Sequence, residues 1–218
     1  NIDVDYARSK GIAVINTPAA STRSVAELAM SHIYALSRNI HRSKKEMSTA
    51  DADFKGLKSG YSKGTELAGK TLGIIGFGRI GQEVAKLAMG SNMRILPYDP
   101  YVEETELKFN IFGNDNLNLA VKVNTVDKEY VIKNSDFITL HLPIADGKPI
   151  IGAEEIAKIK NGVVLINTAR GGAINEDALM EGLASGKIYG AGLDVFDNEP
   201  HPRRDILDHP MISLTPHI

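Results

Sequence analysis

Residues 71–81 read Thr-Leu-Gly-Ile-Ile-Gly-Phe-Gly-Arg-Ile-Gly, and they give the strongest indication of the fold. It places the triplet Gly76-x-Gly78-x-x-Gly81 between a short apolar run, which is strand-like, and a helical pattern. An acidic residue, Asp99, stands 23 residues beyond Gly76. A glycine triplet between a strand and a helix, with an acid at about this distance, is typical of a turn that binds a dinucleotide.

Each residue of this turn has a separate expected task. Gly76 permits the tight turn, Gly78 lets the backbone approach a pyrophosphate, and Gly81 allows the helix to pack closely. The N–H groups at the start of the helix then face the phosphates. Asp99 ends the second predicted strand, where its carboxylate accepts from the hydroxyls of the adenosine ribose and repels a 2′-phosphate. The expected cofactor is therefore NAD rather than NADP.

The composition is that of an ordinary globular protein. Of 218 residues, 43% are apolar and 24% charged, and the net charge is -2, so nothing attracts nucleic acid or anionic lipid. No apolar run approaches the roughly 20 residues that span a membrane. The absence of cysteine excludes disulfides and thiol catalysis. We expect a cytoplasmic protein with no nucleic-acid or membrane partner. Because the chain opens without an initiator Met or a signal-peptide pattern, we also expect a fragment.

The segment before the glycine turn is predicted to hold a strand, a long helix and a loop. Residues 11–16 are strand-like and end at a Thr-Pro dipeptide, which favours extended structure. Ser24-x-x-Glu27 forms a capping box, and apolar side chains then recur at helical spacing to about Lys45. Residues 48–66 are polar and contain three glycines, which indicates a loop.

From residue 71 onward, strand and helix patterns alternate. The expected strands cover residues 71–75, 93–98, about 119–123, 136–142, 162–167, 188–195 and 211–214, and the expected helices cover 80–89, 127–133, 153–160 and 175–185. Such alternation implies parallel strands joined by right-handed crossovers, with helices on both faces. We therefore predict an α/β fold with a doubly wound parallel sheet, an NAD(P)-binding Rossmann fold, in which ligands lie at the carboxyl ends of the strands.

A rival glycine pattern lies just upstream. Gly64-Thr-Glu-Leu-Ala-Gly69-Lys70-Thr71 satisfies the P-loop consensus for nucleoside triphosphates. A P-loop leaves a buried strand and enters a helix, whereas here a polar loop precedes the pattern and a strand follows it. We therefore disfavour a triphosphatase and expect Lys70 at the surface, where a strand starts.

A second informative stretch, Asn167-Thr168-Ala169-Arg170-Gly171-Gly172, directly follows a predicted strand. An arginine at the carboxyl end of a strand faces the ligand side of the sheet. Its planar fork suits bidentate capture of a carboxylate, and the glycines leave room for ligand and backbone together. From this stretch alone, a structural salt bridge is an equal alternative.

Titratable groups also follow the last two predicted strands. Asp194 ends one of them, Glu199-Pro200 lies in the next loop, and the final strand runs into Thr-Pro-His217. A carboxylate beside a histidine stabilises the imidazolium, which suits proton transfer at physiological pH. The other five histidines lack metal-ligand spacing with carboxylates or with one another, so we predict no metal site.

Several blocks occur in one order along nearly the whole chain. They are Gly11-Ile12-x-Val14-x-Asn16-Thr17-Pro18, Ser24-Val25-Ala26-Glu27, Leu67-x-Gly69-Lys70 with the glycine turn, Asp136-x-Ile138-x-Leu140-His141-Leu142-Pro143, Asn167 to Gly172, Asp194-Val195-Phe196-x-x-Glu199-Pro200 and Thr215-Pro216-His217-Ile218. In this order they resemble the NAD-binding domain of the D-isomer-specific 2-hydroxyacid dehydrogenases.

The resemblance implies a role for each matched site residue. It makes Arg170 the ligand of the substrate carboxylate, His217 the general acid/base and Glu199 the partner of His217. Beside the three glycines of the turn, Gly76, Gly78 and Gly81, it implies these cofactor contacts: Arg79 and Ile80 at the pyrophosphate, Asp99 at the ribose, Pro143, Thr168 and Ala169 in the cofactor cleft, and Asp194 at the nicotinamide amide.

The implied activity is hydride transfer between NAD and a small-molecule D-2-hydroxy acid or 2-oxo acid. Within the family, the chain looks most like the enzymes that act on D-3-phosphoglycerate in serine biosynthesis, with glycerate/hydroxypyruvate and D-lactate enzymes as alternatives. We expect residues 1–218 to form the dinucleotide-binding domain, with 1–20 and 215–218 adjoining hinges to a largely absent substrate domain. The resemblance also implies a homodimer that packs through the helix from Ser24.

Three features depart from the family pattern. Pro97 lies inside the second predicted strand, so we expect that strand to bulge or end early. Residues 101–130 are long and rich in asparagine, which leaves the third strand poorly placed, and Asn175 stands where aspartate is more usual. From another functional class, the alternative is a dinucleotide-sensing interaction protein, similar to relatives that act as transcriptional corepressors, because such proteins can retain the catalytic residues.

Overall fold

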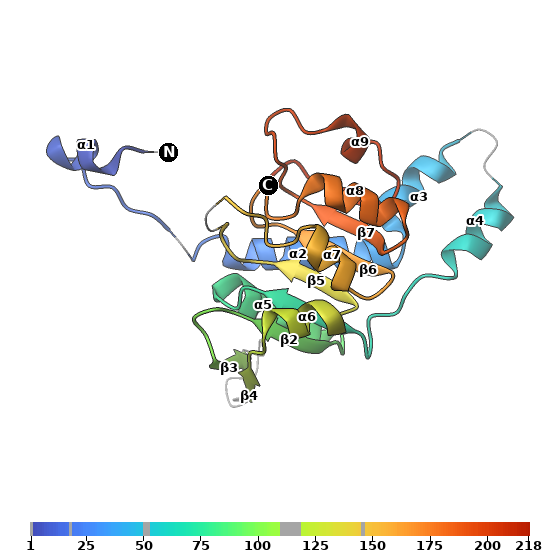
Figure 1. Ribbon diagram of the computed structural model, residues 1–218, viewed down its shortest axis with the longest axis horizontal. Helices are drawn as coiled ribbons and strands as arrows, with labels where there is room; N and C mark the ends of the chain where they lie inside the picture. The colour runs from blue at the N-terminus through green and yellow to red at the C-terminus, as the bar shows by residue number, and fades with distance from the viewer. Residues whose placement is uncertain (1, 18, 50–52, 110–118, 145–146) are drawn as a thin grey trace, which may run out of the picture.

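The computed structural model describes residues 2–17, 19–49, 53–109, 119–144 and 147–218. Its centre is a six-stranded sheet in the order β2-β1-β5-β6-β7-β8, with every neighbouring pair parallel (Figure 1). The strands are β1 (Thr71–Ile75), β2 (Arg94–Tyr98), β5 (Phe137–Leu140), β6 (Val163–Asn167), β7 (Ile188–Leu193) and β8 (Ile212–Leu214).

Helices cover both faces of this sheet, and each face has its own hydrophobic core. Helices α2 (Thr22–Ser37) and α5 (Arg79–Gly90) share one core with Ile74. The next residue, Ile75, points to the other core, because successive side chains of a strand face opposite sides. That second core is formed with α6 (Lys128–Asn134), α7 (Ala153–Lys158), α8 (Glu176–Ala184) and α9 (Arg204–Leu207). The predicted doubly wound α/β fold is confirmed.

The strand order places the glycine turn at the switch point of the sheet. β2 lies on one side of β1 and β5 on the other, so the direction of winding reverses beside β1. In open α/β sheets, ligands bind in the crevice at this point, outside the carboxyl ends of the strands. Residues 76–81 follow β1 directly and therefore occupy that position.

The predicted strand at residues 11–16 is wrong. After helix α1 (Val4–Ser9), residues 12–17 have no regular structure and pair with no strand in the described part of the chain. Ile12 and Ile15 are 59% and 88% exposed, and Figure 1 shows this segment apart from the sheet. An apolar alternation forms a strand only where a neighbouring strand pairs with it, and no strand among the described residues pairs with this segment.

The capping box predicted at Ser24 and Glu27 is also wrong. Helix α2 already begins at Thr22, with Ser21 as the residue that precedes it. The Ser24 hydroxyl donates to the Ser21 carbonyl at 3.0 Å, and Glu27 accepts from Arg23 at 2.6 Å. Because an arginine four residues away competes for the Glu27 carboxylate, the side chain does not turn back to the start of the helix.

The helix predicted to run to about Lys45 is broken, and the loop after it is partly helical. Asn39 has a φ of 58°, a left-handed conformation that ends α2 and starts α3 (Ile40–Met47). Within the predicted loop at residues 48–66 lies α4 (Phe54–Tyr61), whose Lys55 N–H bonds to the Asp53 carboxylate at 3.1 Å. Glycines therefore did not exclude a helix here, because an N-terminal cap was present.

Pro97 neither bulges nor shortens β2. Its register with β1 is regular, since Ile74 pairs with Pro97 and Ile75 with Tyr98. The strand is at the edge of the sheet, where no strand of the described residues pairs with its outer side and a missing N–H is tolerated. The prediction of a bulge or an early end is wrong for that reason.

A separate antiparallel hairpin follows β2, formed by β3 (Glu104–Phe109) and β4 (Leu119–Asn124). The strand expected near 119–123 is confirmed, but it lies outside the main sheet. No strand was predicted for β3, and residues 110–118, between the two strands, lie outside the described residues. Leu107 and Val123 are buried in the core that contains α5, so the hairpin is packed against the domain.

Candidate active site

The three glycines between β1 and α5 have different surroundings. Gly76 has a φ of 103°, and a Cβ there would lie 2.6 Å from the carbonyl carbon of His141. A Cβ on Gly81 would lie 2.0 Å from the Gly76 carbonyl oxygen, so only glycine lets α5 start this close to β1. No atom lies within 4 Å of the position that a Cβ on Gly78 would take, in the part of the chain that is described. These surroundings match the tasks expected of the three residues.

Asp99, the expected ribose ligand, also holds the glycine turn. Its Oδ2 accepts from the Phe77 N–H at 2.7 Å, and its Oδ1 accepts from the Tyr101 N–H at 2.8 Å. The carboxylate is thus fixed at the end of β2 beside the turn. It lines a cavity of about 550 Å³ with Tyr98, Pro100, Thr125, Val126, Asp127 and Tyr130.

The rival P-loop pattern lacks the structure that phosphate binding requires. Gly69 and Lys70 form a turn that leads into β1, and no helix follows them. Lys70 is exposed. The rejection of a P-loop and the surface position of this lysine are both confirmed.

Asn167, to which the sequence assigned no role, shapes the loop after β6. Its Oδ1 accepts from the Ala169 N–H at 3.1 Å, and its Nδ2 donates to the Arg170 carbonyl at 2.9 Å. Thr168 is 8% exposed, and among the described residues its Oγ1 has no hydrogen-bond partner. The loop is therefore fixed by one side chain, and it keeps a hydroxyl unsatisfied at the carboxyl end of β6.

Arg170 is exposed, and it forms no ion pair with the residues that the structure describes. Its Nη1 donates to the neighbouring Ala169 carbonyl at 2.6 Å, and within the described ranges it has no carboxylate partner. A Cβ on Gly171 would lie 1.9 Å from the Phe196 carbonyl oxygen, so this loop packs against the backbone that leads to Glu199. The salt-bridge alternative for Arg170 finds no support in these contacts.

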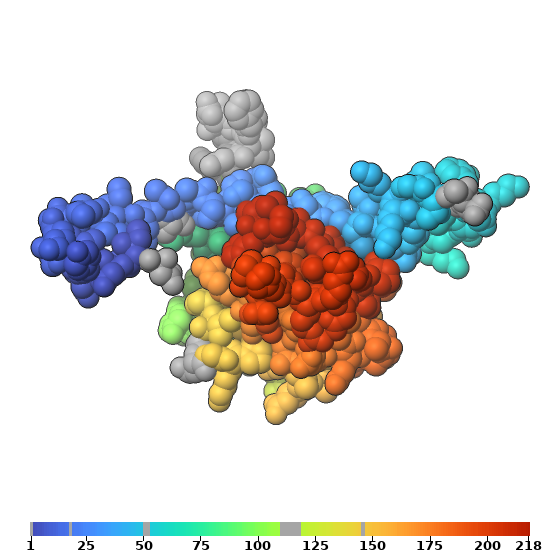
Figure 2. Space-filling model, turned by 90° about the horizontal axis from the view of Figure 1, so that it is seen from above, coloured from blue at the N-terminus to red at the C-terminus, as the bar shows by residue number. Residues whose placement is uncertain are grey.

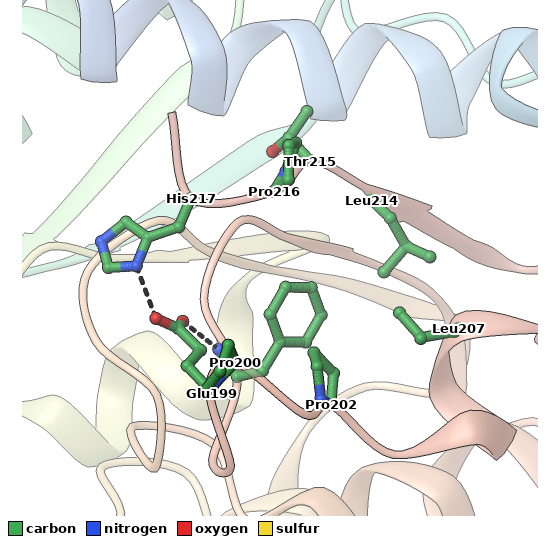
Figure 3. A pocket seen from close by; sticks show the side chains of 9 residues that line it. Glu199, Pro200, Pro202, Leu207, Leu214, Thr215, Pro216 and His217 are labelled. Carbon is green, nitrogen blue, oxygen red and sulfur yellow. Dashed lines mark hydrogen bonds and ion pairs between the residues drawn. The ribbon is translucent and has the colours of Figure 1, made fainter.

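His217 and Glu199 are in direct contact. His217 Nδ1 lies 2.7 Å from Glu199 Oε2, and Glu199 Oε1 accepts from the Phe196 N–H at 2.9 Å. The hydrogen bond with His217 and then the Phe196 N–H hold the pKa of Glu199 below its ordinary value. Figure 3 shows the other ring nitrogen, Nε2, turned away from Glu199. The carboxylate therefore fixes the ring and leaves Nε2 to act on a ligand.

A cavity of about 450 Å³ adjoins this pair (Figure 3). Besides Glu199, Thr215 and His217, its lining is apolar and consists of Phe196, Pro200, Pro202, Leu207, Leu214 and Pro216. The wall of the cavity beside the pair is therefore mainly apolar.

Asp194 ties the end of β7 to the segment that carries His217. Its side chain is 3% exposed, and its Oδ1 accepts from the Thr215 hydroxyl at 2.7 Å and from the Ile218 N–H at 3.1 Å. Thr215 in turn lies 3.1 Å from Nε2 of the buried His32. The sequence reasoning missed His32 and Thr215, although a histidine on the apolar face of a helix was a signal for a polar partner inside the fold.

One further expected cofactor contact, Pro143, lies in the loop after β5. Pro143 is exposed there, on the same edge of the sheet as the glycine turn. His141 Nε2 lies 2.9 Å from Thr139 Oγ1, and burial lowers the pKa of His141 to about 3.

Across the described residues no cluster of three or more His, Asp or Glu could hold a metal ion. Over the same ranges, no helix combines the length and apolar character needed to cross a bilayer.

The residues at this edge fit a bound dinucleotide. The open space at Gly78 admits a ligand close to the backbone, and the exposed Arg79 begins α5, where helix N–H groups attract phosphate. Ile80, half-buried, packs in the core below. The hydroxyl of Thr168 is unsatisfied within the described part of the chain, and Asp99 supplies a carboxylate at the end of β2. The carboxyl ends of β1, β2 and β6 thus offer groups that can bind NAD.

Comparisons with known proteins agree with this geometry. The chain is 48% identical over 222 residues to a hydroxypyruvate reductase from Thermotoga maritima, and the match covers the whole chain and 66% of that protein. It is 42% identical over 218 residues to a D-3-phosphoglycerate dehydrogenase from Methanocaldococcus jannaschii, and the match covers the whole chain and 39% of that protein. The chain therefore spans between two fifths and two thirds of the length of these relatives.

Solved structures and the family comparison add to this. The D-lactate dehydrogenase with NAD⁺ from Lactobacillus jensenii superposes with a TM-score of 0.75 at 28% identity, over 99% of this chain and 64% of that one. Residues 30–218 match the family described as D-isomer specific 2-hydroxyacid dehydrogenase, NAD binding domain. The chain therefore belongs to the D-isomer specific 2-hydroxyacid dehydrogenases and contains the NAD-binding domain of that family.

Proposed function

We propose that the protein carrying this chain is an NAD-dependent dehydrogenase that transfers a hydride between the nicotinamide and a D-2-hydroxy acid or its 2-oxo acid. The observation that carries this proposal is the 2.7 Å contact between His217 and Glu199 on the sheet edge that also holds the glycine turn. Oxidation of an alcohol by NAD requires a proton acceptor beside the dinucleotide. The pair supplies that acceptor.

Each member of the site has a distinct task in this proposal. His217 takes the proton of the substrate hydroxyl at Nε2 during oxidation, and the imidazolium returns it during reduction. Glu199 bonds to Nδ1 and thereby fixes which ring nitrogen faces the substrate. Arg170 binds the substrate carboxylate through its guanidinium fork. NAD, when bound, supplies the acceptor for the hydride.

The residues proposed to hold the cofactor come from the ends of several strands. They are Gly76, Gly78, Gly81, Arg79 and Ile80 for the pyrophosphate, Asp99 for the ribose, Pro143, Thr168 and Ala169 for the cleft, and Asp194 for the nicotinamide amide. Their positions at the carboxyl edge of β1, β2, β5, β6 and β7 support this assignment.

For the substrate, we propose D-3-phosphoglycerate, on the resemblance of the sequence blocks. Hydroxypyruvate and D-glycerate form the second candidate pair, and the 48% identity to a hydroxypyruvate reductase favours them. The two candidates differ by one phosphate group. A ratio of kcat/KM for phosphorylated and unphosphorylated three-carbon 2-oxo acids therefore decides between them.

The first test of the proposal is a titration with NADH, NADPH and ATP-Mg²⁺, followed by nicotinamide fluorescence and thermal stabilisation. We expect NADH alone to raise the Tm, since a ligand that binds only the native state stabilises it by mass action. Asp99→Ala should reduce the preference for NADH over NADPH. Unchanged preference in this variant would contradict the role of Asp99.

Turnover is measured on the full-length protein with a panel of 2-oxo acids. His217→Ala should lower kcat by about 10²- to 10⁴-fold, the usual contribution of a general acid/base, with NADH affinity retained. NADH binding without turnover of any 2-oxo acid, together with NADH-dependent binding of another protein, would replace the dehydrogenase by a dinucleotide-sensing interaction protein.

The assembly and setting of the protein are part of the same proposal. Residues 1–218 form its dinucleotide-binding domain, with residues 1–20 and 215–218 leading to a substrate domain. We also propose a homodimer. The apolar face of α2 packs inside this domain against α5 and the sheet, so this face is not free for a second copy of the chain. The proposal is supported instead by exposed apolar side chains in the segments before and after α2, which include Ile12, Ile15, Ile40 and Phe54. A cytoplasmic location stays a prediction.

A further inference from the structure

A buried histidine on α2 bridges two residues of the segment that leads to His217. His32 is 3% exposed, its Nδ1 lies 2.9 Å from Ser213 Oγ, and its Nε2 lies 3.1 Å from Thr215 Oγ1. A Cβ on Gly192 would lie 2.6 Å from the Cβ of His32. Glycine at this position of β7 therefore gives the imidazole room to lie against the sheet.

The hydrogen-bond chain does not end at Thr215. The Thr215 hydroxyl lies 2.7 Å from Oδ1 of Asp194, and an ionised carboxylate only accepts hydrogen bonds. Thr215 must therefore donate its single hydroxyl hydrogen to Asp194. Its oxygen can then only accept from His32, so Nε2 of His32 carries a hydrogen.

The same assignment of hydrogens determines the role of the other ring nitrogen, Nδ1. A neutral imidazole with a hydrogen on Nε2 has a lone pair on Nδ1, which accepts from the Ser213 hydroxyl. Burial lowers the pKa of His32, and the nearby charge of Asp194 opposes this only in part. The ring is thus neutral at pH 7, and the three hydrogen bonds run in one direction, from Ser213 through His32 and Thr215 to Asp194.

We propose that His32 is a positioning residue that directs the Thr215 hydroxyl onto Asp194 and thereby fixes the carboxylate beside the catalytic segment. Oδ1 of Asp194 also accepts from the Ile218 N–H at 3.1 Å, and Ile218 is the neighbour of His217. Occupation of Oδ1 by these two donors leaves Oδ2 for the nicotinamide amide, a step that rests on the proposed function. His32 acts through Thr215 and touches neither cofactor nor substrate.

The direction of the hydrogen bonds is tested without any variant or ligand. Long-range ¹⁵N–¹H correlation spectra of the histidine side chains of this chain, recorded at pH 7, separate the two neutral tautomers and the imidazolium. We expect His32 as the neutral form with its hydrogen on Nε2. A hydrogen on Nδ1, or a charged ring at pH 7, would overturn the proposal.

The effect on the site is tested with matched substitutions. His32→Leu and Thr215→Val should each weaken NADH binding by about tenfold, which corresponds to about 1.4 kcal/mol, the scale of one hydrogen bond. The double variant should be no weaker than either single one, because both break the same chain. His32→Gln, whose amide can donate in place of Nε2, should recover most of the affinity.

His41→Leu is the control for loss of a histidine between helix and sheet. His41 bridges the Ala35 and Pro210 carbonyls at 3.1 and 3.0 Å, away from Asp194, so this variant should lose stability with unchanged NADH affinity. If His32→Leu behaves like His41→Leu, the positioning role is wrong. If the unaltered chain binds no NADH, the proposed function fails. The positioning role of His32 is then still tested by the tautomer of the unaltered chain and by the hydrogen-exchange protection of the Ile218 amide in His32→Leu.

Discussion

At the scale of single residues, Gly78 tests whether the glycine turn carries a ligand. Its φ is not in the left-handed region, and its would-be Cβ meets nothing within 4 Å in the described structure. Gly78→Ala should therefore leave the Tm unchanged and weaken NADH binding at least about tenfold, since the methyl group occupies the space of the pyrophosphate. Parallel thermal melts and NADH titrations measure both quantities. Full affinity in a stable variant would mean that no ligand approaches the backbone here.

Glu199 tests the pairing that the proposed chemistry needs. Its pKa lies below the ordinary value, first because of the bond with His217, so the carboxylate is charged at neutral and mildly acidic pH. In Glu199→Gln the imidazolium loses this partner. We expect kcat/KM of this variant to be lower in both directions by about 10- to 100-fold, because the ring is no longer held with Nε2 towards the substrate.

The measurement is the pH profile of kcat/KM in both directions. Asp197→Asn, in the same loop, is the control, because within the described ranges Asp197 is bonded through its backbone N–H, to Glu176 at 3.0 Å, and not through its side chain. An identical pH profile in Glu199→Gln would show that this carboxylate does not assist the proton transfer.

At the scale of secondary-structure elements, the packing of α5 against β1 depends on Gly81. A Cβ there would lie 2.0 Å from the Gly76 carbonyl oxygen, so Gly81→Ala forces the helix away from the turn. We expect a loss of about 1–3 kcal/mol in the free energy of unfolding, as for other overpacked sites. Gly90→Ala is the matched control at the other end of α5, where nothing in the described residues lies within 4 Å. It should be neutral or stabilising by up to about 1 kcal/mol. Urea unfolding of both variants measures the difference.

Asp136 joins the starts of β1 and β5, and this makes the sheet sensitive to acid. Its Oδ2 accepts from the Thr71 N–H at 2.9 Å, and its Oδ1 accepts from Lys160 at 3.0 Å. Burial acts to raise the pKa of Asp136, but these two bonds outweigh it, and the pKa lies below the ordinary value. The stabilisation is therefore full above the unfolded pKa of about 3.9. It is lost as the pH falls through the lower folded value.

Asp136→Asn should accordingly be less stable than the unaltered chain at pH 7, and the gap should close at a pH below both values. Urea unfolding at several pH values measures this. Asp5→Asn, at a side chain that is 94% exposed, is the control. A gap that stays constant down to the lowest pH would show that the charge of Asp136 contributes nothing.

At the scale of the whole molecule, two arms extend from opposite sides of the domain. Figure 2 shows α1 on one side and the α3–α4 segment on the other, with the C-terminal third of the chain between them. Ile15, in the first arm, is 88% exposed. Exposed aliphatic side chains on extended arms mark a surface for association, and this supports the proposed dimer.

Sedimentation equilibrium of the chain should therefore give twice the mass of the monomer. Ile15→Asp should shift the equilibrium towards the monomer, because burial of an unpaired carboxylate is unfavourable. Tyr101→Ser, at a side chain that is 92% exposed but at the end of β2, is the control and should stay dimeric. A monomer for the unaltered chain at micromolar concentration would exclude the homodimer.

Local sequence patterns were enough to predict the parallel sheet, the glycine turn and the polar residues at the strand ends. These follow from patterns within a few residues, such as the apolar run at 71–75 and the order of strand, glycine and helix. Arg170, Asp194 and His217 could be placed on one edge because parallel strands end at the same side of a sheet.

Which of these groups are in contact depends on how distant segments of the chain are arranged in the fold. The bond between His217 and Glu199, and the chain from His32 to Asp194, join residues up to 183 positions apart. Contacts with neighbouring segments also shape three elements that local patterns did not predict: the segment at 12–17, the break at Asn39 and the β3–β4 hairpin. A local pattern indicates which secondary structure and which chemistry a residue allows. Its hydrogen-bond partners and its burial come from segments that are distant in the sequence, so they are fixed only in the folded chain.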